Sequence, residues 1–265
     1  MLNRVLGNES VKKDLLKLKD KIPPVIIFNG PPKIGKIFTA YNFIDEIYNL
    51  QSRLYTHPDI QIFESDTLVF KIELINKLRN SVLVTPFEID KKFFLLRNVD
   101  TMNKESFNRI LKILEDRNST DYFILTCKNL DNLPKTVVSR SVVFNFLPIL
   151  NLKEYFPQLT DLQLKLMQGC PGNFSLIEKL DLTNLYELIK NLLISIKILS
   201  YAEILEKYSL LKNIDKEILI NLINIVALDI MSLETIEALK KLREKLEFTL
   251  FPDMHIKNMF LFLKE

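Results

Sequence analysis

The sequence has little glycine, only two cysteines and no tryptophan. Cys127 and Cys170 stand far apart and form no C-x-x-C pair, so neither a disulfide framework nor a zinc site is predicted. The N-terminal stretch lacks the unbroken apolar core of a signal peptide, and no apolar run is long enough to span a bilayer. We therefore expect a soluble, cytoplasmic protein with no membrane partner and no metal site.

A strong excess of one charge is also missing. The chain carries 36 basic and 33 acidic residues, a formal net charge of +3. Proteins that bind nucleic acids on their own usually carry a strongly basic surface. This chain is close to neutral, so direct DNA binding without partners is the least favoured function.

Glycine is scarce enough for its positions to be informative. Five glycines occur in 265 residues, and four of them form two short pairs, Gly30 with Gly35 and Gly169 with Gly172. Glycine is needed where the backbone adopts a positive φ or closely approaches another group. These pairs therefore indicate constrained loops.

The first part of the chain alternates between apolar runs of strand length and segments with helical periodicity. The predicted strands are 25–28, 60–63, 93–96, 122–126 and 142–146, and the predicted helices are 10–21, 36–50, 70–84 and 104–116. Such alternation over about 150 residues predicts a three-layer α/β domain with a mainly parallel sheet.

Strand-type runs disappear after Pro148, and apolar residues then recur at helical spacing almost to the end. We predict three domains: an α/β domain over 1–147, a small helical domain over 148–183 and a helical C-terminal domain over 184–265.

A glycine loop follows the first buried strand and leads into a helix. Gly30, Gly35 and Lys36 keep the spacing of the phosphate-binding motif G-x-x-x-x-G-K-[ST], in which backbone N–H groups and the lysine hold phosphates. The last position of the motif is Ile37, which has no hydroxyl group to bind Mg²⁺. The loop is therefore interpreted as a P-loop that has lost a metal ligand.

A working P-loop ATPase also needs a carboxylate at the end of a neighbouring strand. The strand 93–96 is followed by Arg97, and the first acid, Asp100, comes four residues after the apolar run. An arginine at this position places a positive charge where the metal would sit. We therefore expect ATP hydrolysis at this site to be negligible.

Several further segments match one family in sequence order. They are Val5-Leu6-Gly7-Asn8-Glu9, His57-Pro58-Asp59, Asn108–Glu115, Tyr122–Thr126 and Ser139-Arg140-Ser141. Together with the glycine loop, they resemble the clamp-loader branch of AAA+ proteins, most closely the delta-prime subunits of bacterial DNA polymerase III, over residues 1–147. The resemblance implies an AAA+ P-loop domain, a helical lid domain and an all-α collar domain through which subunits assemble.

The resemblance also implies what the nucleotide-site residues do. Gly7 would lie near the adenine pocket of active relatives, and Gly30, Gly35 and Lys36 would form a vestigial phosphate loop. Arg97 stands where relatives carry the metal-binding acid. The site of this chain would therefore hold no cofactor.

The segment around Arg140 retains the arginine that has a catalytic role in the family it resembles. Arg140, next to Ser139, would point out of the subunit and reach the γ-phosphate of ATP in the neighbouring subunit as an arginine finger. Two features of relatives are missing. There is no four-cysteine zinc module before His57, so no zinc is expected, and Asn173 and Phe174 stand where a phosphate-contacting arginine is expected.

The expected function is that of an ATPase-inactive clamp-loader subunit of the DNA polymerase III holoenzyme, a stator in a pentameric ring. ATP and Mg²⁺ would be bound by the neighbouring subunit. The expected partners are the motor and clamp-opening subunits, the sliding clamp and, through the complex, primer–template DNA. Two alternatives remain, an ATP-hydrolysing motor subunit that uses Lys36 and Asp100, and a DNA-binding AAA+ relative outside replication.

Overall fold

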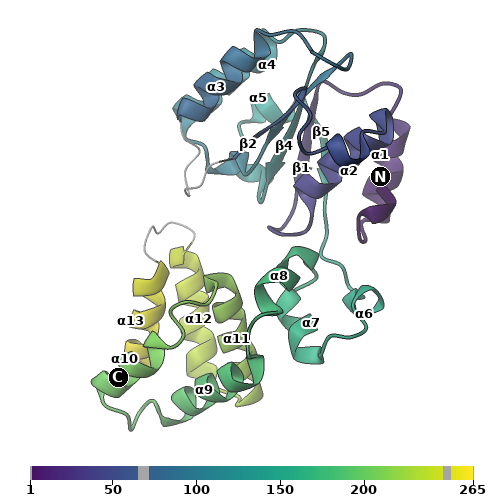
Figure 1. The fold of residues 1–265 in the computed structure, drawn as a ribbon. Helices are drawn as coiled ribbons and strands as arrows, with labels where there is room; N and C mark the ends of the chain where they lie inside the picture. Colours follow the sequence, from purple (N-terminus) through teal and green to yellow (C-terminus); the bar gives the residue numbers. More distant parts are fainter. Residues whose placement is uncertain (1, 65–71, 247–251, 265) are drawn as a thin grey trace. The chain divides into compact units, whose positions relative to one another are not determined.

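The computed structural model describes residues 2–64, 72–246 and 252–264. The chain forms two compact units, one of Met1–Pro157 with Gln168–Gly172 and one of Gln158–Met167 with Asn173–Glu265. The first is an α/β unit and the second is helical (Figure 1). The domain boundaries expected at residues 147 and 183 stay a prediction.

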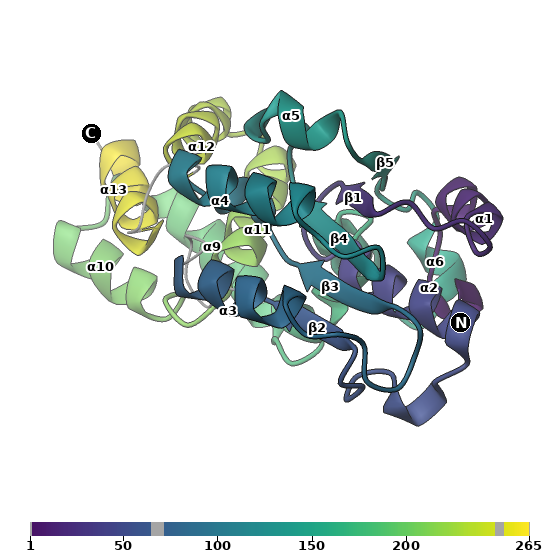
Figure 2. The same cartoon turned by 90° about the horizontal axis from the view of Figure 1, so that it is seen from above.

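The α/β unit is built on one parallel sheet. Its strands are β1 (Val25–Asn29), β2 (Ile60–Phe63), β3 (Lys92–Leu96), β4 (Asp121–Cys127) and β5 (Val142–Asn145). Its α-helices are α1 (Glu9–Lys17), α2 (Lys36–Tyr48), α3 (Ile72–Val82), α4 (Lys104–Glu115), α5 (Lys135–Val138) and α6 (Leu152–Tyr155). Short 3₁₀ turns are η1 (Leu2–Arg4), η2 (Gln51–Arg53), η3 (Val99–Thr101) and η4 (Leu130–Asn132). The strand order is β2-β3-β4-β1-β5, with every pairing parallel (Figure 2). This confirms the expected fold class.

The central strands β1, β3 and β4 carry continuous apolar runs over 25–28, 93–96 and 122–125, because both faces of the sheet are covered there. In β1, Ile26 and Phe28 pack with residues of α1 and α2, whereas Val25 and Ile27 pack with residues of α3, α4 and α5. Successive side chains of a strand point to opposite faces, so two helical layers require apolar residues without interruption. Figure 1 shows the two helical layers on either side of the sheet.

Two helices of this unit end earlier than predicted. The helix expected over 10–21 ends at Lys17, and the chain then turns so that Ile22 joins the core ahead of β1. The helix expected over 36–50 ends at Tyr48, and Asn49 follows in a left-handed conformation with φ 52°. The helix expected over 70–84 is α3, although its first two predicted residues lie outside the described part.

The helical unit is arranged around a buried helix. Its α-helices are α7 (Asp161–Met167), α8 (Phe174–Ile177), α9 (Leu182–Ser195), α10 (Tyr201–Ser209), α11 (Lys216–Asp229), α12 (Leu233–Leu246) and α13 (Pro252–Lys264). The turn η5 (Pro171–Asn173) leads into α8. Helix α11 buries consecutive residues, including Ile218, Leu219 and Ile220, because neighbouring helices cover most of its circumference. No described helix combines the length and the apolar content needed to cross a bilayer.

The aromatic layer between β3 and β4 generates a prediction about stability. Phe94 is fully buried and stacks on Phe123, with ring centroids 5.1 Å apart. Phe94→Ala should lower the free energy of unfolding by about 3–5 kcal/mol, because it removes this contact and leaves a cavity. Urea denaturation measures the loss. Phe87→Ala, at a phenylalanine that is 82% exposed, is the control and should cost less than about 0.5 kcal/mol; equal losses would contradict the assigned core.

Candidate functional site

The glycine loop connects β1 to α2 at the edge of the sheet where the strands end. Gly30 has φ +148°, and a Cβ atom there would lie 2.5 Å from the carbonyl oxygen of Phe146. Gly35 has φ +103° and is the N-cap residue of α2. The spacing of the two glycines therefore reflects a close backbone approach at one end of the loop and a left-handed turn at the other.

Lys36 points back into its own loop. Its Nζ atom donates to the carbonyl oxygens of Gly30 at 2.5 Å and Pro31 at 2.7 Å, and the residue is only 7% exposed. Burial lowers the pKa of Lys36 to about 8, against the opposing influence of Cys127, Asp100 and Cys170, while Arg97 lowers it further. The ammonium group that would bind phosphate in a working P-loop is thus already bonded to the protein.

No hydroxyl group replaces the missing metal ligand at the start of α2 in this structure. The side chain of Ile37 packs against the core of the α/β unit. The first hydroxyl along this helix belongs to Thr39, which is fully buried and donates to the carbonyl oxygen of Gly35 at 2.9 Å. The start of α2 therefore presents an apolar side chain where a P-loop presents a magnesium ligand.

The chain after β3 departs from a catalytic arrangement in a second way. Arg97 pairs with Glu64, and Oδ2 of Asp100 accepts the backbone N–H groups of Lys128 at 2.8 Å and Asn129 at 3.2 Å. Asp100 thus holds the turn that follows β4. A role for Asp100 as a metal-binding acid would compete with these two hydrogen bonds.

The N-terminal motif, residues 5–9, is hydrogen-bonded to the chain that follows β5. Asn8 donates its side-chain amide to the carbonyl oxygen of Leu147 at 3.1 Å and accepts the Leu147 N–H at 2.8 Å. Gly7 has φ +62°, and a Cβ atom there would lie 2.7 Å from the side chain of Ile149. Gly7 and Gly30 therefore border the same segment, residues 146–149.

Arg140 lies at the opposite edge of the sheet. It follows α5 and precedes β5, whose first residue, Val142, is paired with Ile26 near the start of β1. Its guanidinium group donates to the carbonyl oxygen of Thr136 at 3.0 Å and lies 3.3 Å from the carboxylate of Glu115, with half of the side chain exposed. The structure therefore brings Gly30, Gly35 and Lys36 together and places Arg140, with its neighbour Ser139, away from them.

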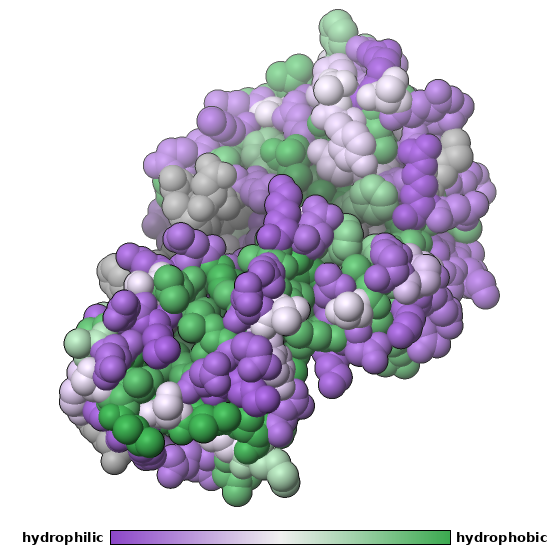
Figure 3. All heavy atoms as spheres, turned by 60° about the horizontal axis from the view of Figure 1, so that its bottom comes forward, coloured by the Kyte–Doolittle hydropathy of each residue, from purple (hydrophilic) through white to green (hydrophobic). Residues whose placement is uncertain are grey.

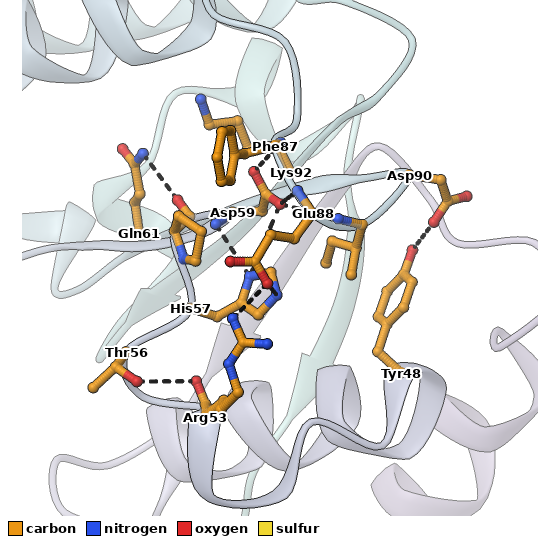
Figure 4. Close-up of polar contacts among 12 residues, drawn as sticks. Tyr48, Arg53, Thr56, His57, Asp59, Gln61, Phe87, Glu88, Asp90 and Lys92 are labelled. Carbon is orange, nitrogen blue, oxygen red and sulfur yellow. Dashed lines mark hydrogen bonds and ion pairs between the residues drawn. The ribbon is translucent and has the colours of Figure 1, made fainter.

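Figure 4 shows a buried polar network around His57 and Asp59, the outer residues of the His-Pro-Asp segment. The carboxylate of Asp59 accepts the backbone N–H groups of Phe87 at 2.6 Å, Glu88 at 2.7 Å and Ile89 at 3.1 Å. Burial acts to raise the pKa of Asp59, but these three hydrogen bonds and the nearby His57 outweigh it and hold the pKa below its ordinary value. Asp59 thus fixes the loop before β3 to the start of β2.

His57 completes this network. Its Nδ1 atom accepts the N–H of Asp59 at 3.2 Å, and its Nε2 atom lies 3.6 Å from the carboxylate of Glu88, which also pairs with Arg53 at 2.5 Å. In the sequence, only the His-Pro-Asp segment itself indicated this network. Within residues 2–64, 72–246 and 252–264, no group of three or more histidine, cysteine or acidic side chains could hold a metal ion.

The network supports an exposed apolar tip formed by Leu83, Val84 and Phe87, which are 76%, 58% and 82% exposed. The buried ammonium group of Lys92 donates to the carbonyl oxygens of Ser81 at 3.0 Å and Val84 at 3.2 Å. Buried charged groups therefore fix the backbone on both sides of these side chains. Exposed apolar side chains grouped on an ordered backbone are typical of a surface that binds another protein.

Comparison with known proteins relates this fold to replication proteins. The family model described as DNA polymerase III, delta subunit matches residues 9–149. The DNA polymerase III subunit delta' of Bacillus subtilis is 25% identical over 145 residues, covering 49% of this chain and 44% of the relative. The Replication factor C small subunit of Sulfolobus acidocaldarius is 25% identical over 150 residues, covering 56% of this chain and 45% of the relative. The chain therefore spans under half the length of these relatives.

A solved structure extends the likeness to the whole fold. A DNA polymerase III, gamma subunit-related protein of Thermotoga maritima has a TM-score of 0.59 and 16% identity, covering 96% of this chain and 98% of its own. At this identity the likeness concerns the fold alone. It includes the helical region that the family model does not reach.

The buried ammonium group of Lys36 predicts a dependence of stability on pH. Its pKa is about 8 in the folded chain and has an ordinary value of 10.5. Between these values the unfolded chain binds more protons at this position, so the free energy of unfolding of the wild type should rise with pH relative to Lys36→Met, by up to about 1.4 kcal/mol per pH unit. Urea denaturation of both proteins from pH 7 to pH 10.5 measures the difference. A constant or falling difference would show that the ammonium group is solvated.

The three hydrogen bonds to Asp59 predict that its charge stabilises the fold. Asp59→Asn should lower the free energy of unfolding by about 1.5–3 kcal/mol at pH 7, because the N–H groups lose a charged acceptor. Because the pKa of Asp59 is lowered from 3.8, this loss should shrink as the pH falls through 3.8 and below. Asp14→Asn, at an exposed ion pair with Lys17, is the control and should cost at most about 1 kcal/mol. Equal losses from both variants would refute the role given to Asp59.

Proposed function

The chain belongs to the DNA polymerase III delta subunit family of AAA+ clamp-loader proteins, and on this premise we propose that it is an ATPase-inactive, delta-prime-like subunit. It serves as a stator in a pentameric ring and supplies Arg140 to the ATP site of a neighbouring subunit. Its own site holds no cofactor. The ATP and Mg²⁺ that Arg140 serves are bound by that neighbour. The ring places a sliding clamp on primed DNA.

The placement of Arg140 is the observation that carries this proposal. A parallel sheet has a carboxyl edge, where its strands end, and an amino edge. The glycine loop follows β1 at the carboxyl edge, whereas Arg140 precedes β5 at the amino edge. An arginine at the amino edge serves a nucleotide bound by another subunit better than one bound by its own loop. Thr136 and Glu115 hold it half exposed, available to a partner.

The loss of hydrolysis is supported by three independent departures from a working site. The ammonium group of Lys36 is bonded to its own loop, Ile37 has no hydroxyl group, and Asp100 is engaged by two backbone N–H groups. Phosphoryl transfer depends on positioning and on compensation of negative charge by a metal and by cations. A motor subunit that uses Lys36 and Asp100, the first alternative, would have to rearrange both residues.

Two surfaces support assembly with partners. The apolar tip presents Phe87 and its neighbours, and apolar side chains also gather on the face of the helical unit seen in Figure 3. Large exposed residues in that unit include Ile198, Met231 and Leu233, which are 87%, 84% and 75% exposed. Grouped apolar side chains at the surface are typical of protein interfaces. We propose that the helical unit joins the collar of the ring with the motor and clamp-opening subunits.

Contact with primer–template DNA is proposed only within the assembled complex. A groove of about 470 Å³ between α3 and α4 is lined by three cationic residues, Arg79, Arg109 and Lys112, by one acidic residue, Asp116, and by apolar residues such as Ile113. Cationic side chains on one face are suited to phosphate contacts. The small net charge of the chain, +3, argues against the second alternative, a relative that binds DNA alone.

The proposal predicts the effect of Arg140→Ala in a complex reconstituted with the motor and clamp-opening subunits of the same organism and the sliding clamp. Turnover at the site that Arg140 completes should fall by about 10³-fold or more, because an arginine finger stabilises charge in the transition state. Clamp-stimulated phosphate release of the complex should therefore fall by the share of total turnover that this site contributes. Gel filtration should show an intact complex.

Arg97→Ala is the matched control. Arg97 has a comparable exposure and a carboxylate partner, but it lies at the opposite edge of the sheet. Its substitution should leave turnover unchanged. Equal turnover of the wild type and Arg140→Ala, or a loss with Arg97→Ala alone, would overturn the proposed role of Arg140.

A further inference from the structure

The helical unit carries a groove of about 400 Å³ between α12 and α13, two helices that lie side by side (Figure 1). Each helix contributes four residues at the spacing i, i+3, i+4 and i+7, which belongs to one helix face. In α12 these residues are Ala238, Lys241, Leu242 and Lys245. In α13 they are His255, Asn258, Met259 and Phe262. The lining therefore follows both helices for about two turns.

The floor of this groove is apolar. Ala238, Leu242 and Met259 are buried, whereas Phe262 stands at the rim and is 60% exposed. The aromatic ring is thus apolar surface that water covers in the isolated chain. Covering such surface with a partner is the main favourable term in most protein–protein association.

The charged side chains of the lining have one sign. Lys241 and Lys245 are exposed, and the ammonium group of Lys241 lies 6.0 Å from the centre of the Phe262 ring on the facing helix. His255 and Asn258 add N–H donors. Within the described part of the chain, no acidic residue lines the groove and no carboxylate pairs with either ammonium group. The groove therefore favours a partner with negative charge.

The shape of the groove favours a helix as its occupant. Helices pack with the side-chain ridges of one in the grooves of another, and a helix bound in an apolar groove presents anchors at i, i+3, i+4 and i+7. The lining of this groove has that spacing on both of its sides. A nucleic-acid backbone would use the two lysines and leave the apolar floor and Phe262 uncovered.

We propose that the groove between α12 and α13 binds an acidic amphipathic helix of a partner protein. The apolar stripe of that helix lies on the floor beside Phe262, and carboxylates on its flanks pair with Lys241 and Lys245. The inference goes beyond the proposed function, because it involves neither Arg140 nor the glycine loop and applies to the chain outside a ring.

A synthetic helix tests the groove on the full chain. The probe is a fluorescein-labelled peptide of 14 residues, the length of α12, with leucine at i, i+3, i+4 and i+7 and glutamate on both sides of this stripe. A lactam staple keeps it helical, because isolated helices this short are marginal in water. Its fluorescence anisotropy should saturate with a Kd below about 100 μM.

The control probe carries lysine in place of each glutamate and should bind at least about tenfold more weakly. A rise in salt from about 0.05 M to about 0.5 M should weaken binding of the acidic peptide, because salt screens exposed charges. No saturation by the acidic peptide, or equal binding of the two peptides, would overturn the proposal.

Two pairs of variants locate the bound peptide. Lys241→Glu should weaken binding at least about tenfold, whereas Lys240→Glu makes the same change of charge at an exposed lysine outside the lining and should change it less than about twofold. Phe262→Ala should weaken binding at least about tenfold, and Leu210→Ala, at a leucine that is 64% exposed elsewhere in the unit, should not. Equal losses within either pair would place the peptide elsewhere and contradict the proposal.

Two further measurements separate the partner helix from other occupants. Analytical ultracentrifugation without peptide should show a monomer; a dimer that Lys241→Glu dissociates would assign the groove to a second copy of this chain and overturn the proposal. A short DNA duplex should leave the bound peptide in place. Displacement of the peptide by the duplex would assign the lysines to phosphate binding and would also overturn it.

Discussion

The contact between the ammonium group of Lys36 and the carbonyl oxygens of Gly30 and Pro31 is the interaction on which the account depends. A P-loop binds anions because its lysine and its backbone N–H groups converge on the bound phosphate. When the lysine turns inward, the same sequence motif becomes an internal connection between β1 and α2. Burial of the ammonium group costs desolvation energy, and this cost lowers the pKa of the lysine to about 8. An apolar residue at this position would not carry that cost. The spacing of the motif thus persists while its chemistry changes.

The parallel sheet divides the remaining chemistry between two edges. The glycine loop, Arg97 and Asp100 follow strands and meet at the carboxyl edge, where ligands of open α/β sheets are usually bound. Arg140 precedes a strand and lies at the amino edge. Under the function we propose, this separation would let a subunit lose its own site and keep the arginine that it offers to a neighbour. The chain belongs to the DNA polymerase III delta subunit family, and its relatives include a protein named DNA polymerase III subunit delta'.

The sequence was sufficient to predict most of the fold. All five strands were predicted within two residues at each end. The three central strands are buried on both faces, and this burial requires the continuous apolar runs that made them recognisable. Helix α1 was predicted too long, because the lysine-rich residues after Lys17 keep a helical composition while the buried Ile22 requires a turn. Local pattern could not reveal that tertiary requirement.

The sequence identified the residues of the candidate site, but it did not predict which groups they contact. The motif located Lys36, but only the fold shows that its ammonium group faces inward. Asp100 and Asp59 find their partners about 30 residues away, in the turn after β4 and the loop before β3. Nothing in the sequence of those loops indicates that their backbone N–H groups donate to a carboxylate. The fold decides whether an acid binds a metal or holds a loop.

We propose that the lysine of the P-loop stays bonded to its own loop and that this chain does not turn over ATP. The most direct test is single-turnover hydrolysis by the purified chain, in excess over labelled ATP with Mg²⁺, compared with Lys36→Met. We expect the same background release of phosphate from both proteins. Release by the wild type that is lost in Lys36→Met would contradict it, because the lysine would then be serving a nucleotide.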